Sequence, residues 1–228
     1  RPKSSAASDV YKRQERYLPP MAEGKEVWCQ LFSEPSAGSD VAGLRSKAVQ
    51  DGENWIVNGQ KVWTSGAHFS DYGTLVVRHD PGLEKHKGLT FFFVDMKSPG
   101  IDVKPIKQLT GGSSFNEVYF NDVVIPDSQR LGEIGDGWKV AITTLMNERL
   151  AVGDADGVDA NEAFELAKKH DKDGEQLIDN NAVRESIADW YCEASGLKNT
   201  KLRTMSALSR GDTPCLLYTS PSPRDGRE

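Results

Sequence analysis

The chain contains a loop of small residues that could hold a ligand. After the run Gln30-Leu31-Phe32 comes Ser33–Asp40, with the sequence SEPSAGSD. Small residues let backbone N–H groups approach a ligand, and serine hydroxyls add hydrogen-bond donors without bulk. The loop could therefore bind a phosphate or the polar edge of a ring. The alternative interpretation is a plain turn between two strands.

A second stretch combines an aromatic ring with hydroxyl groups. In Gly59–Ala67 (GQKVWTSGA), Trp63 and Ser65 are two residues apart, with Thr64 between them. On a strand, Trp63 and Ser65 would point to the same face. A tryptophan can cover a flat cofactor ring while a nearby hydroxyl bonds a ring nitrogen. The alternative is a core tryptophan with a surface serine.

A third candidate is the carboxylate in Asn147-Glu148-Arg149. A carboxylate placed beside a substrate can act as a general base, and a neighbouring arginine can bind a negatively charged group. Taken alone, an adjacent glutamate and arginine are most often part of a solvated helix surface. Both interpretations stay open from these residues.

The first two stretches lie in a region whose pattern predicts β-structure. From Val27 to about Val124, short β-rich runs alternate with turn residues, which is typical of an antiparallel barrel or sandwich. The expected strands are Val27–Phe32, Leu44–Val49, Asn54–Val57, Thr74–Arg78, Leu89–Asp95 and Glu117–Val124. The expected turns are Asp51-Gly52, Asn58-Gly59, Pro81-Gly82 and Pro99-Gly100.

After Gly137 the apolar residues recur with a helical period, so the fold class we expect is α+β. A first helix begins here, and a second is expected from about Asn181 to Ser209. The second helix has a continuous apolar stripe, made of Ile187, Trp190, Tyr191, Ala194, Leu197, Leu202, Met205 and Leu208. Such a stripe has to be buried against other helices. We expect the rest of a four-helix bundle, or another subunit, to cover it.

The order and spacing of these motifs resemble the acyl-CoA dehydrogenase family. The family pattern is an aromatic-rich strand ending in T/S-E-P-x-A-G-S-D, followed by N-G-x-K-x-W-x-T/S. The resemblance covers about residues 17–214 and is most specific between 28 and 150. It continues through the segments Lys87–Asp95, Ser98–Gly100, Phe115–Phe120, Val123–Pro126 and Gly135–Trp138.

The resemblance implies three domains, of which the chain carries parts. Residues 15–26 would be a remnant of an N-terminal helical domain, and residues 27–134 a middle β-domain that binds flavin and acyl-CoA. Residues 135–214 would be the first part of a C-terminal helical bundle. Such a fragment is expected to be inactive by itself.

The resemblance also implies FAD as the cofactor and assigns residues to it. Gln30, Leu31, Phe32 and Ser33 would line the flavin ring, with the Ser33 hydroxyl at its pyrimidine edge. Gly38 and Ser39 would lie near the pyrophosphate, with Ser39 also near the CoA arm of the substrate. Trp63 would shield the dimethylbenzene side, next to Thr64, and Ser65 would bond the ring nitrogen that receives hydride.

The implied reaction is the α,β-dehydrogenation of an acyl-CoA thioester to an enoyl-CoA, as in fatty acid β-oxidation. Glu148 would be the base in a minority of members, and otherwise the base comes from beyond Pro214. Arg149 would lie near the substrate. The implied partners are an electron-transfer flavoprotein and further copies of the chain, in a dimer or tetramer.

Two other functions fit the same residues. One is a flavin oxidase or monooxygenase on the same scaffold, which acts with oxygen. The other is a noncatalytic β-barrel module that binds a partner or carbohydrate. One segment departs from the family, because Lys168–Gly174 (KKHDKDG) stands where members often carry Arg-x-x-Phe-Gly. This departure puts the usual contact with a neighbouring subunit's flavin in doubt.

Both ends of the chain have a sequence that is explained by a single DNA element. A DNA string that encodes Asp9–Gln14, taken as its reverse complement and read one base in, encodes Cys215–Ser220. Both ends resemble translated sequencing-library adaptor. We therefore expect residues 1–14 and 215–228 to be non-native.

Composition narrows the partners and the compartment. The net charge of −6 argues against a nucleic-acid-binding surface. The longest apolar run is far shorter than the roughly 20 residues of a membrane-spanning helix. The four histidines show no ligand spacing, so we expect no metal site. Few and distant cysteines favour a reducing compartment, and we expect a cytoplasmic protein.

Overall fold

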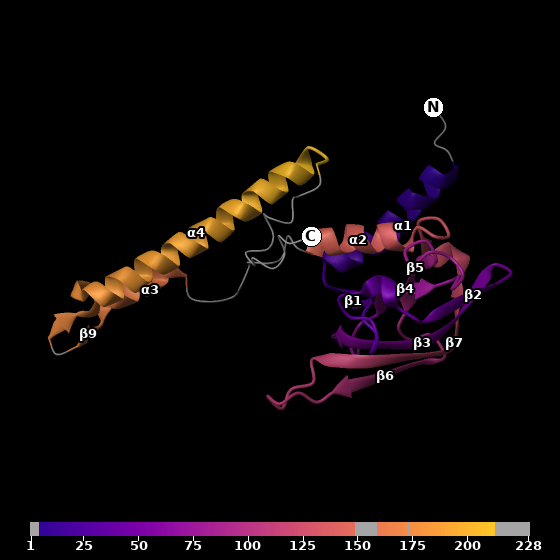
Figure 1. Ribbon diagram of the computed structural model, residues 1–228, viewed down its shortest axis with the longest axis horizontal. Coiled ribbons are helices and arrows are strands. Elements are labelled where there is room, and N and C mark those ends of the chain that lie inside the picture. Colours follow the sequence, from indigo (N-terminus) through magenta and orange to yellow (C-terminus); the bar gives the residue numbers. More distant parts are fainter. Residues whose placement is uncertain (1–4, 149–158, 173, 213–228) are drawn as a thin grey trace. The chain divides into compact units, whose positions relative to one another are not determined.

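The computed structural model describes residues 5–148, 159–172 and 174–212. The chain divides into two compact units, Arg1–Thr143 and Thr144–Glu228, which are considered separately (Figure 1). The first unit contains one helix before the sheet, the eight strands of the sheet, and most of α2. These elements are α1 (Ser5–Ala22), β1 (Trp28–Leu31), β2 (Lys47–Asp51), β3 (Asn54–Ser65), β4 (Tyr72–Arg78), β5 (Leu89–Asp95), β6 (Ile101–Ile106), β7 (Phe115–Pro126), β8 (Arg130–Leu131) and α2 (Gly137–Glu148).

The strands form one open sheet in the order β6-β7-β3-β2-β4-β5-β8. The α+β fold class is confirmed, although an open sheet is neither a closed barrel nor a sandwich. Two pairings are parallel, which the antiparallel expectation did not include. Strand β1 pairs with β4 from Trp28–Tyr72 to Leu31–Leu75, and β2 meets β4 at Lys47–Arg78. Because β1 and β2 both lie on β4, the loop between them leaves the sheet opposite Leu75 and rejoins it opposite Arg78, the last residue of β4.

The core of the first unit is formed by one face of the sheet. It contains Leu31, Trp55, Phe92, Phe120 and other buried residues. The run Leu89–Val94 is buried at every position, so β5 is covered on both faces. The sequence of a strand that is covered on both faces is a continuous apolar run, without alternating polar residues. On the second face, Tyr17 of α1 contacts Trp28, Tyr72 and Phe93 edge-on, with ring centroids 4.9–5.6 Å apart.

The prediction of a turn at Asn58-Gly59 is wrong, because both residues lie inside β3. The pairing with β7 shifts register between Val57 and Gly59, which marks a bulge. Asn58 and Asp122 secure this bulge by exchanging two hydrogen bonds of 2.8 and 2.9 Å. A bulge and a turn use the same residue types, so the sequence alone did not distinguish them. The strand β3 therefore runs on to Ser65 instead of ending at Val57.

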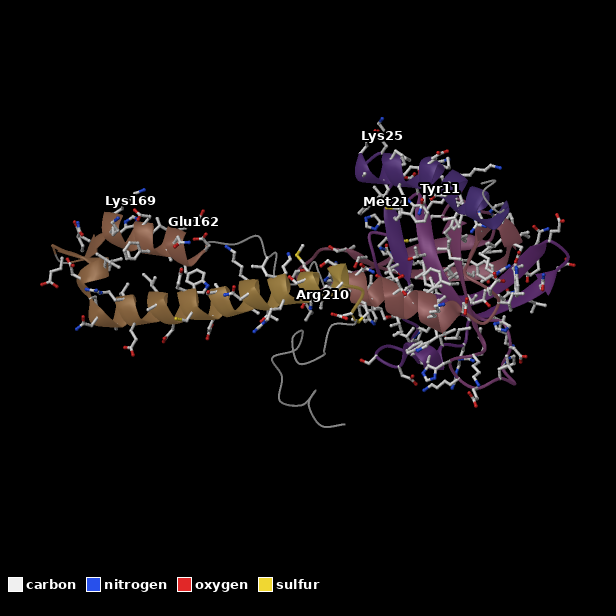
Figure 2. All side chains as sticks on the ribbon, turned by 90° about the horizontal axis from the view of Figure 1, so that it is seen from above. Tyr11, Met21, Lys25, Glu162, Lys169 and Arg210 are labelled. Carbon is white, nitrogen blue, oxygen red and sulfur yellow. The ribbon has the colours of Figure 1, made fainter. Side chains whose placement is uncertain are left out.

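The second unit is a helical hairpin with a small two-stranded sheet at its turn (Figures 1 and 2). Asp159 caps α3 by accepting from Glu162 N, and Asn180 caps α4 by accepting from Ala182 N and Val183 N. The second predicted helix is confirmed with the same bounds. The elements are the end of α2, then α3 (Ala160–Lys169), β9 (Asp171–Lys172), β10 (Glu175–Gln176) and α4 (Asn181–Ser209).

The apolar stripe of α4 is exposed along much of its length. Its exposed members are Trp190, Tyr191, Leu197, Leu202 and Met205. Exposure of so many large apolar side chains agrees with the expectation that further helices cover this face. Which chain supplies them stays a prediction. None of the described helices is both long enough and apolar enough to span a bilayer.

Candidate functional site

The structure brings together the two stretches whose residues could hold a ligand. Ser33 follows the end of β1, and Val62–Ser65 form the end of β3. The Val62 N–H donates to the Ser33 carbonyl oxygen over 2.9 Å. This single hydrogen bond joins the small-residue loop to the strand that carries the aromatic and the hydroxyl.

Trp63 has an unusual backbone conformation at this junction. Its φ is 59°, in the left-handed region that residues with a side chain rarely adopt. The pairing of β3 with β7 shifts register between Lys61 and Thr64, so one extra residue is accommodated here. As a result, Trp63 and Ser65 are exposed while Lys61, Val62 and Thr64 are buried. Trp63 and Ser65 are therefore both exposed, and their common face stays a prediction.

The indole of Trp63 is available to a ligand. Its residue is 60% exposed, and its one ring contact is edge-on against Phe115, with centroids 6.1 Å apart. A bulky aromatic left this open offers a flat apolar surface. Ser65, two residues further along the chain, is also exposed and carries a hydroxyl group.

The other predicted cofactor residues differ in what they can present. Leu31 and Phe32 are buried in the core, so their side chains are not presented at the surface. Gln30 and Ser33 are half-buried, and Gly38 and Ser39 are exposed in the loop. The predicted cofactor residues are therefore of two kinds: some lie at the surface, and others are buried behind them.

Thr64 belongs to the supporting group. It is buried between Trp63 and Ser65, and its Oγ1 has no hydrogen-bond partner among the described residues. A buried hydroxyl without a partner is costly. Its backbone oxygen is bonded, since the Asn116 side-chain amide donates to it over 2.9 Å.

Glu34 and Lys61 form a buried ion pair directly behind this surface. Lys61 Nζ donates to Glu34 Oε1 over 2.8 Å and to the Phe32 carbonyl oxygen over 3.1 Å. The backbone N–H groups of Arg45 and Ser46 donate to the same carboxylate over 2.6 and 3.0 Å. We did not single out this pair from the sequence. The sequence did contain an indication of it, because Glu34 belongs to the first motif and Lys61 to the second.

The environment shifts the pKa of both partners. Burial raises the pKa of the Glu34 carboxyl, but the Lys61 charge and the backbone and side-chain donors outweigh it and bring the pKa below the usual 4.5. Burial is the main cause that lowers the pKa of Lys61 from 10.5 to about 8, against the opposing charge of Glu34.

The small-residue loop is also held from its far end. Glu34 and Ala37 exchange backbone hydrogen bonds of 2.9 and 3.0 Å, which closes a tight turn after Ser33. Arg78 on β4 donates to the carbonyl oxygens of Leu44 and Ala42 over 3.1 and 2.6 Å. Gly38 lies in open space, with nothing within 4 Å of the place where a Cβ would be. The loop is thus anchored at both ends and open in its middle.

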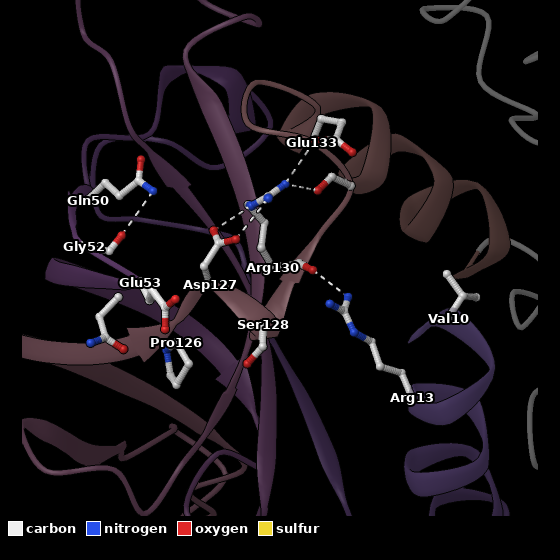
Figure 3. A pocket seen from close by; sticks show the side chains of 12 residues that line it. Val10, Arg13, Gln50, Gly52, Glu53, Pro126, Asp127, Ser128, Arg130 and Glu133 are labelled. Carbon is white, nitrogen blue, oxygen red and sulfur yellow. Dashed lines mark hydrogen bonds and ion pairs between the residues drawn. The ribbon is translucent and has the colours of Figure 1, made fainter. Parts of the chain in front are cut away.

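A cavity lies elsewhere in the first unit (Figure 3). Its volume is about 820 Å³, and it is lined by residues near the ends of β2, β3 and β7, with Asp127 and Arg130 paired over 2.9 Å in its wall. None of the predicted ligand residues lines it. Two of its wall residues, Val10 and Arg13, fall in the segment predicted to be non-native. We therefore do not assign a function to this cavity.

The predicted base belongs to the second unit, unlike Ser39, the predicted substrate residue in the small-residue loop. Glu148 is exposed at the last position of α2. Arg149 lies outside the described residues. Across the described parts of the chain, no group of three or more His, Cys, Asp and Glu side chains is arranged to hold a metal ion.

Comparison with known proteins identifies the family. "Acyl-CoA dehydrogenase, middle domain" matches residues 29–123, and "Acyl-CoA dehydrogenase, C-terminal domain" matches residues 135–221. The chain belongs to the acyl-CoA dehydrogenase family. Among curated relatives of this family, acyl-CoA dehydrogenase FadE34 of Mycobacterium tuberculosis is 51% identical over 138 residues. That match covers 60% of this chain and 19% of FadE34.

Longer acyl-CoA dehydrogenase matches extend over both units. Cyclohexane-1-carbonyl-CoA dehydrogenase of Geobacter metallireducens is 32% identical over 227 residues, covering 90% of this chain and 59% of that protein. The crystal structure of an acyl-CoA dehydrogenase from Geobacillus kaustophilus matches with a TM-score of 0.76 and 25% identity, covering 88% of this chain and 55% of that one. The chain therefore spans less than two thirds of these family members.

The residues of the first unit fit the flavin that the family generally uses. A flat ring needs an open aromatic neighbour and hydrogen-bond donors at its polar edge. Trp63 supplies the first, and the hydroxyls of Ser33 and Ser65 supply the second. The glycine and serine at positions 38 and 39 leave room for phosphate groups in an open loop.

Proposed function

We propose that the protein containing this chain is an FAD-dependent dehydrogenase that converts an acyl-CoA thioester into an enoyl-CoA. One observation supports this most strongly. The hydrogen bond from Val62 N to Ser33 O joins the two family motifs, so half-buried Ser33 and exposed Trp63 and Ser65 belong to two backbone stretches that lie side by side. Family membership supplies the type of reaction.

Each residue has a separate task in this proposal. The Ser33 hydroxyl bonds the pyrimidine edge of the flavin, and the Ser65 hydroxyl bonds the ring nitrogen that takes part in the reaction. The Trp63 indole shields the ring from water. The loop at Gly38 and Ser39 offers backbone and hydroxyl donors to phosphate groups of the flavin and of the CoA arm.

The chemistry divides between cofactor and protein. Bound FAD accepts the hydride from the β-carbon, while a protein carboxylate removes the α-proton and leaves the double bond. Within this chain Glu148 is the candidate for that carboxylate, and Arg149 is the candidate for a substrate contact. The two electrons then pass to an electron-transfer flavoprotein, and the exposed stripe of α4 packs in a homo-oligomer.

The visible absorption spectrum of the full-length protein that carries residues 15–214 tests this function. We expect flavin bands that bleach when an acyl-CoA of the right chain length is added. Bands that bleach only with a substrate other than a CoA thioester, with oxygen consumed, would assign an oxidase or monooxygenase instead. If the protein is colourless and so contains no flavin, the noncatalytic binding module would be the remaining interpretation.

A variant of the same protein tests the base. Glu148→Gln keeps the size of the side chain but cannot accept the α-proton. If Glu148 is the base, flavin bleaching by acyl-CoA slows by about 100-fold or more while FAD remains bound. A normal bleaching rate would place the base beyond residue 214.

A further inference from the structure

The buried ion pair of Glu34 and Lys61 joins three separate segments of the first unit. The Lys61 side chain is 0% exposed and that of Glu34 is 4% exposed. Through its hydrogen bonds the pair connects the backbone at Phe32, at the Arg45-Ser46 dipeptide and at Lys61 itself. Phe32 belongs to one stretch predicted to hold the flavin, and Lys61 lies two residues before the other.

Stability alone does not account for this pair. Removing two charges from water costs several kcal/mol per ion, and well-packed apolar residues of similar volume often serve as well or better. The geometry of the pair is specific, because Lys61 has two acceptors and the Glu34 carboxylate has three donors. An arrangement of this kind fixes the relative positions of the segments it joins.

The bulge in β3 shows why the position of Lys61 matters for the surface. In a strand that alternated regularly, Lys61 would lie on the same face as Trp63 and Ser65, which are two and four residues further along the chain. The register shift turns Lys61 inward and leaves Trp63 outward. Lys61 then bonds the carbonyl oxygen of Phe32, the residue directly before Ser33. The ion pair and the Val62–Ser33 hydrogen bond thus act on the same two backbone stretches.

We propose that Glu34 and Lys61 are positioning residues, which hold Ser33 in place against Trp63 and Ser65 so that the three form one rigid flavin-binding surface. This inference rests on the proposed function. The pair itself does not touch the flavin, since both side chains are buried. Its effect is to reduce the ordering that flavin binding would otherwise require.

The variant Glu34→Gln/Lys61→Met tests the role of the pair. It removes both charges while keeping the side-chain volumes close, so we expect the fold to persist. The matched control is Asp102→Asn/Lys104→Met, which removes the exposed pair of Asp102 and Lys104, joined over 3.2 Å on β6. If the ion-pair variant loses its cooperative unfolding transition, Glu34→Gln alone replaces it, because the glutamine oxygen still accepts from the backbone donors and the buried lysine can lose its charge as a neutral amine.

The first readout is amide hydrogen exchange in this 228-residue chain without flavin. We expect the amides of Ser46 and Val62 to exchange about ten-fold faster or more in the ion-pair variant, because their local opening becomes easier. Amides of the β4–β5 pairing should exchange as before, and the control should match the unsubstituted chain. Unchanged exchange at Ser46 and Val62 would overturn the inference.

The second readout is FAD binding by the full-length protein with the same substitutions. We expect about ten-fold weaker FAD binding and broader flavin absorption bands in the ion-pair variant, with neither change in the control. If the unsubstituted protein, the ion-pair variant and the control all bind FAD equally well with the same absorption bands, the inference is overturned while the proposed function stands. Absence of flavin from the unsubstituted protein would overturn the proposed function, and the flavin-binding role of the pair would fall with it.

Discussion

Replacing Gly59 by alanine is expected to destabilise the first unit strongly. Gly59 lies in β3 opposite the place where β7 carries an extra residue, and its φ of 152° disfavours residues with a side chain. An added Cβ would lie 2.5 Å from Cβ and 2.7 Å from Cα of Ser46. The side chain of Ser46 could rotate, but its Cα belongs to the backbone that Glu34 holds. The strand and the loop would therefore have to separate.

The magnitude follows from two costs. The backbone conformation costs about 1–3 kcal/mol for a residue other than glycine. Forcing a methyl group into a filled space costs about 1–3 kcal/mol more. We therefore expect the free energy of unfolding to fall by about 2–6 kcal/mol, which is a large part of the total for a small domain.

Gly52→Ala is the matched control for Gly59→Ala. Gly52 also has a positive φ, of 60°, but nothing lies within 4 Å of its missing Cβ, so it isolates the backbone cost of about 1–2 kcal/mol. Urea unfolding is followed by tryptophan fluorescence in a Trp190→Phe background, in which all remaining tryptophans lie in the first unit. The reasoning is refuted if Gly59→Ala costs no more than Gly52→Ala.

Four further outcomes are expected. Thiol labelling at pH 8, located by peptide mapping, should modify exposed Cys192 quickly and leave Cys29 unmodified until unfolding, because burial raises the pKa of Cys29 to about 11. Asn180→Ala should destabilise the second unit by about 1 kcal/mol in thermal unfolding followed by circular dichroism, since it removes the cap of α4. Trp63→Gly should be about 1 kcal/mol more stable than Trp63→Ala by urea midpoint, because glycine tolerates the positive φ. The pKa of Lys61 falls from 10.5 to about 8 on folding, so between pH 8 and pH 10.5 the native state binds fewer protons than the unfolded state. Across this range the free energy of unfolding should therefore rise with pH, relative to that of Lys61→Met.

Much of the fold followed from local pattern. The alternation of β-rich runs and turn residues predicted most strands, and helical periodicity predicted α4 with the observed bounds. The strand Ile101–Ile106 was missed. Its polar and charged residues and its proline weaken the apolar alternation, because the strand lies at one end of the sheet order. The parallel pairing of β1 with β4 was also missed, since partners far apart in sequence leave no local signal.

The candidate site was predictable only in part. Trp63 and Ser65, which their side-chain types indicated as possible ligand contacts, are both exposed. The burial of Lys61 could not be predicted by alternation, because the bulge interrupts the period of two between Lys61 and Thr64. Alternation from Trp63 would have placed the lysine on the exposed face. Detecting the ion pair required seeing that the glutamate of the first motif and the lysine of the second meet in space.

Several of the costly features of the first unit lie behind and around one small surface. Trp63 has a strained backbone, Thr64 has a buried hydroxyl without a partner among the described residues, and Glu34 and Lys61 carry buried charges. Each of these disfavours folding on its own. A sheet built for stability alone could replace all of them with apolar residues in ordinary conformations. Their concentration beside the exposed indole and hydroxyls is explained if that surface is held in shape for a ligand, which is the role that the family resemblance assigns to it.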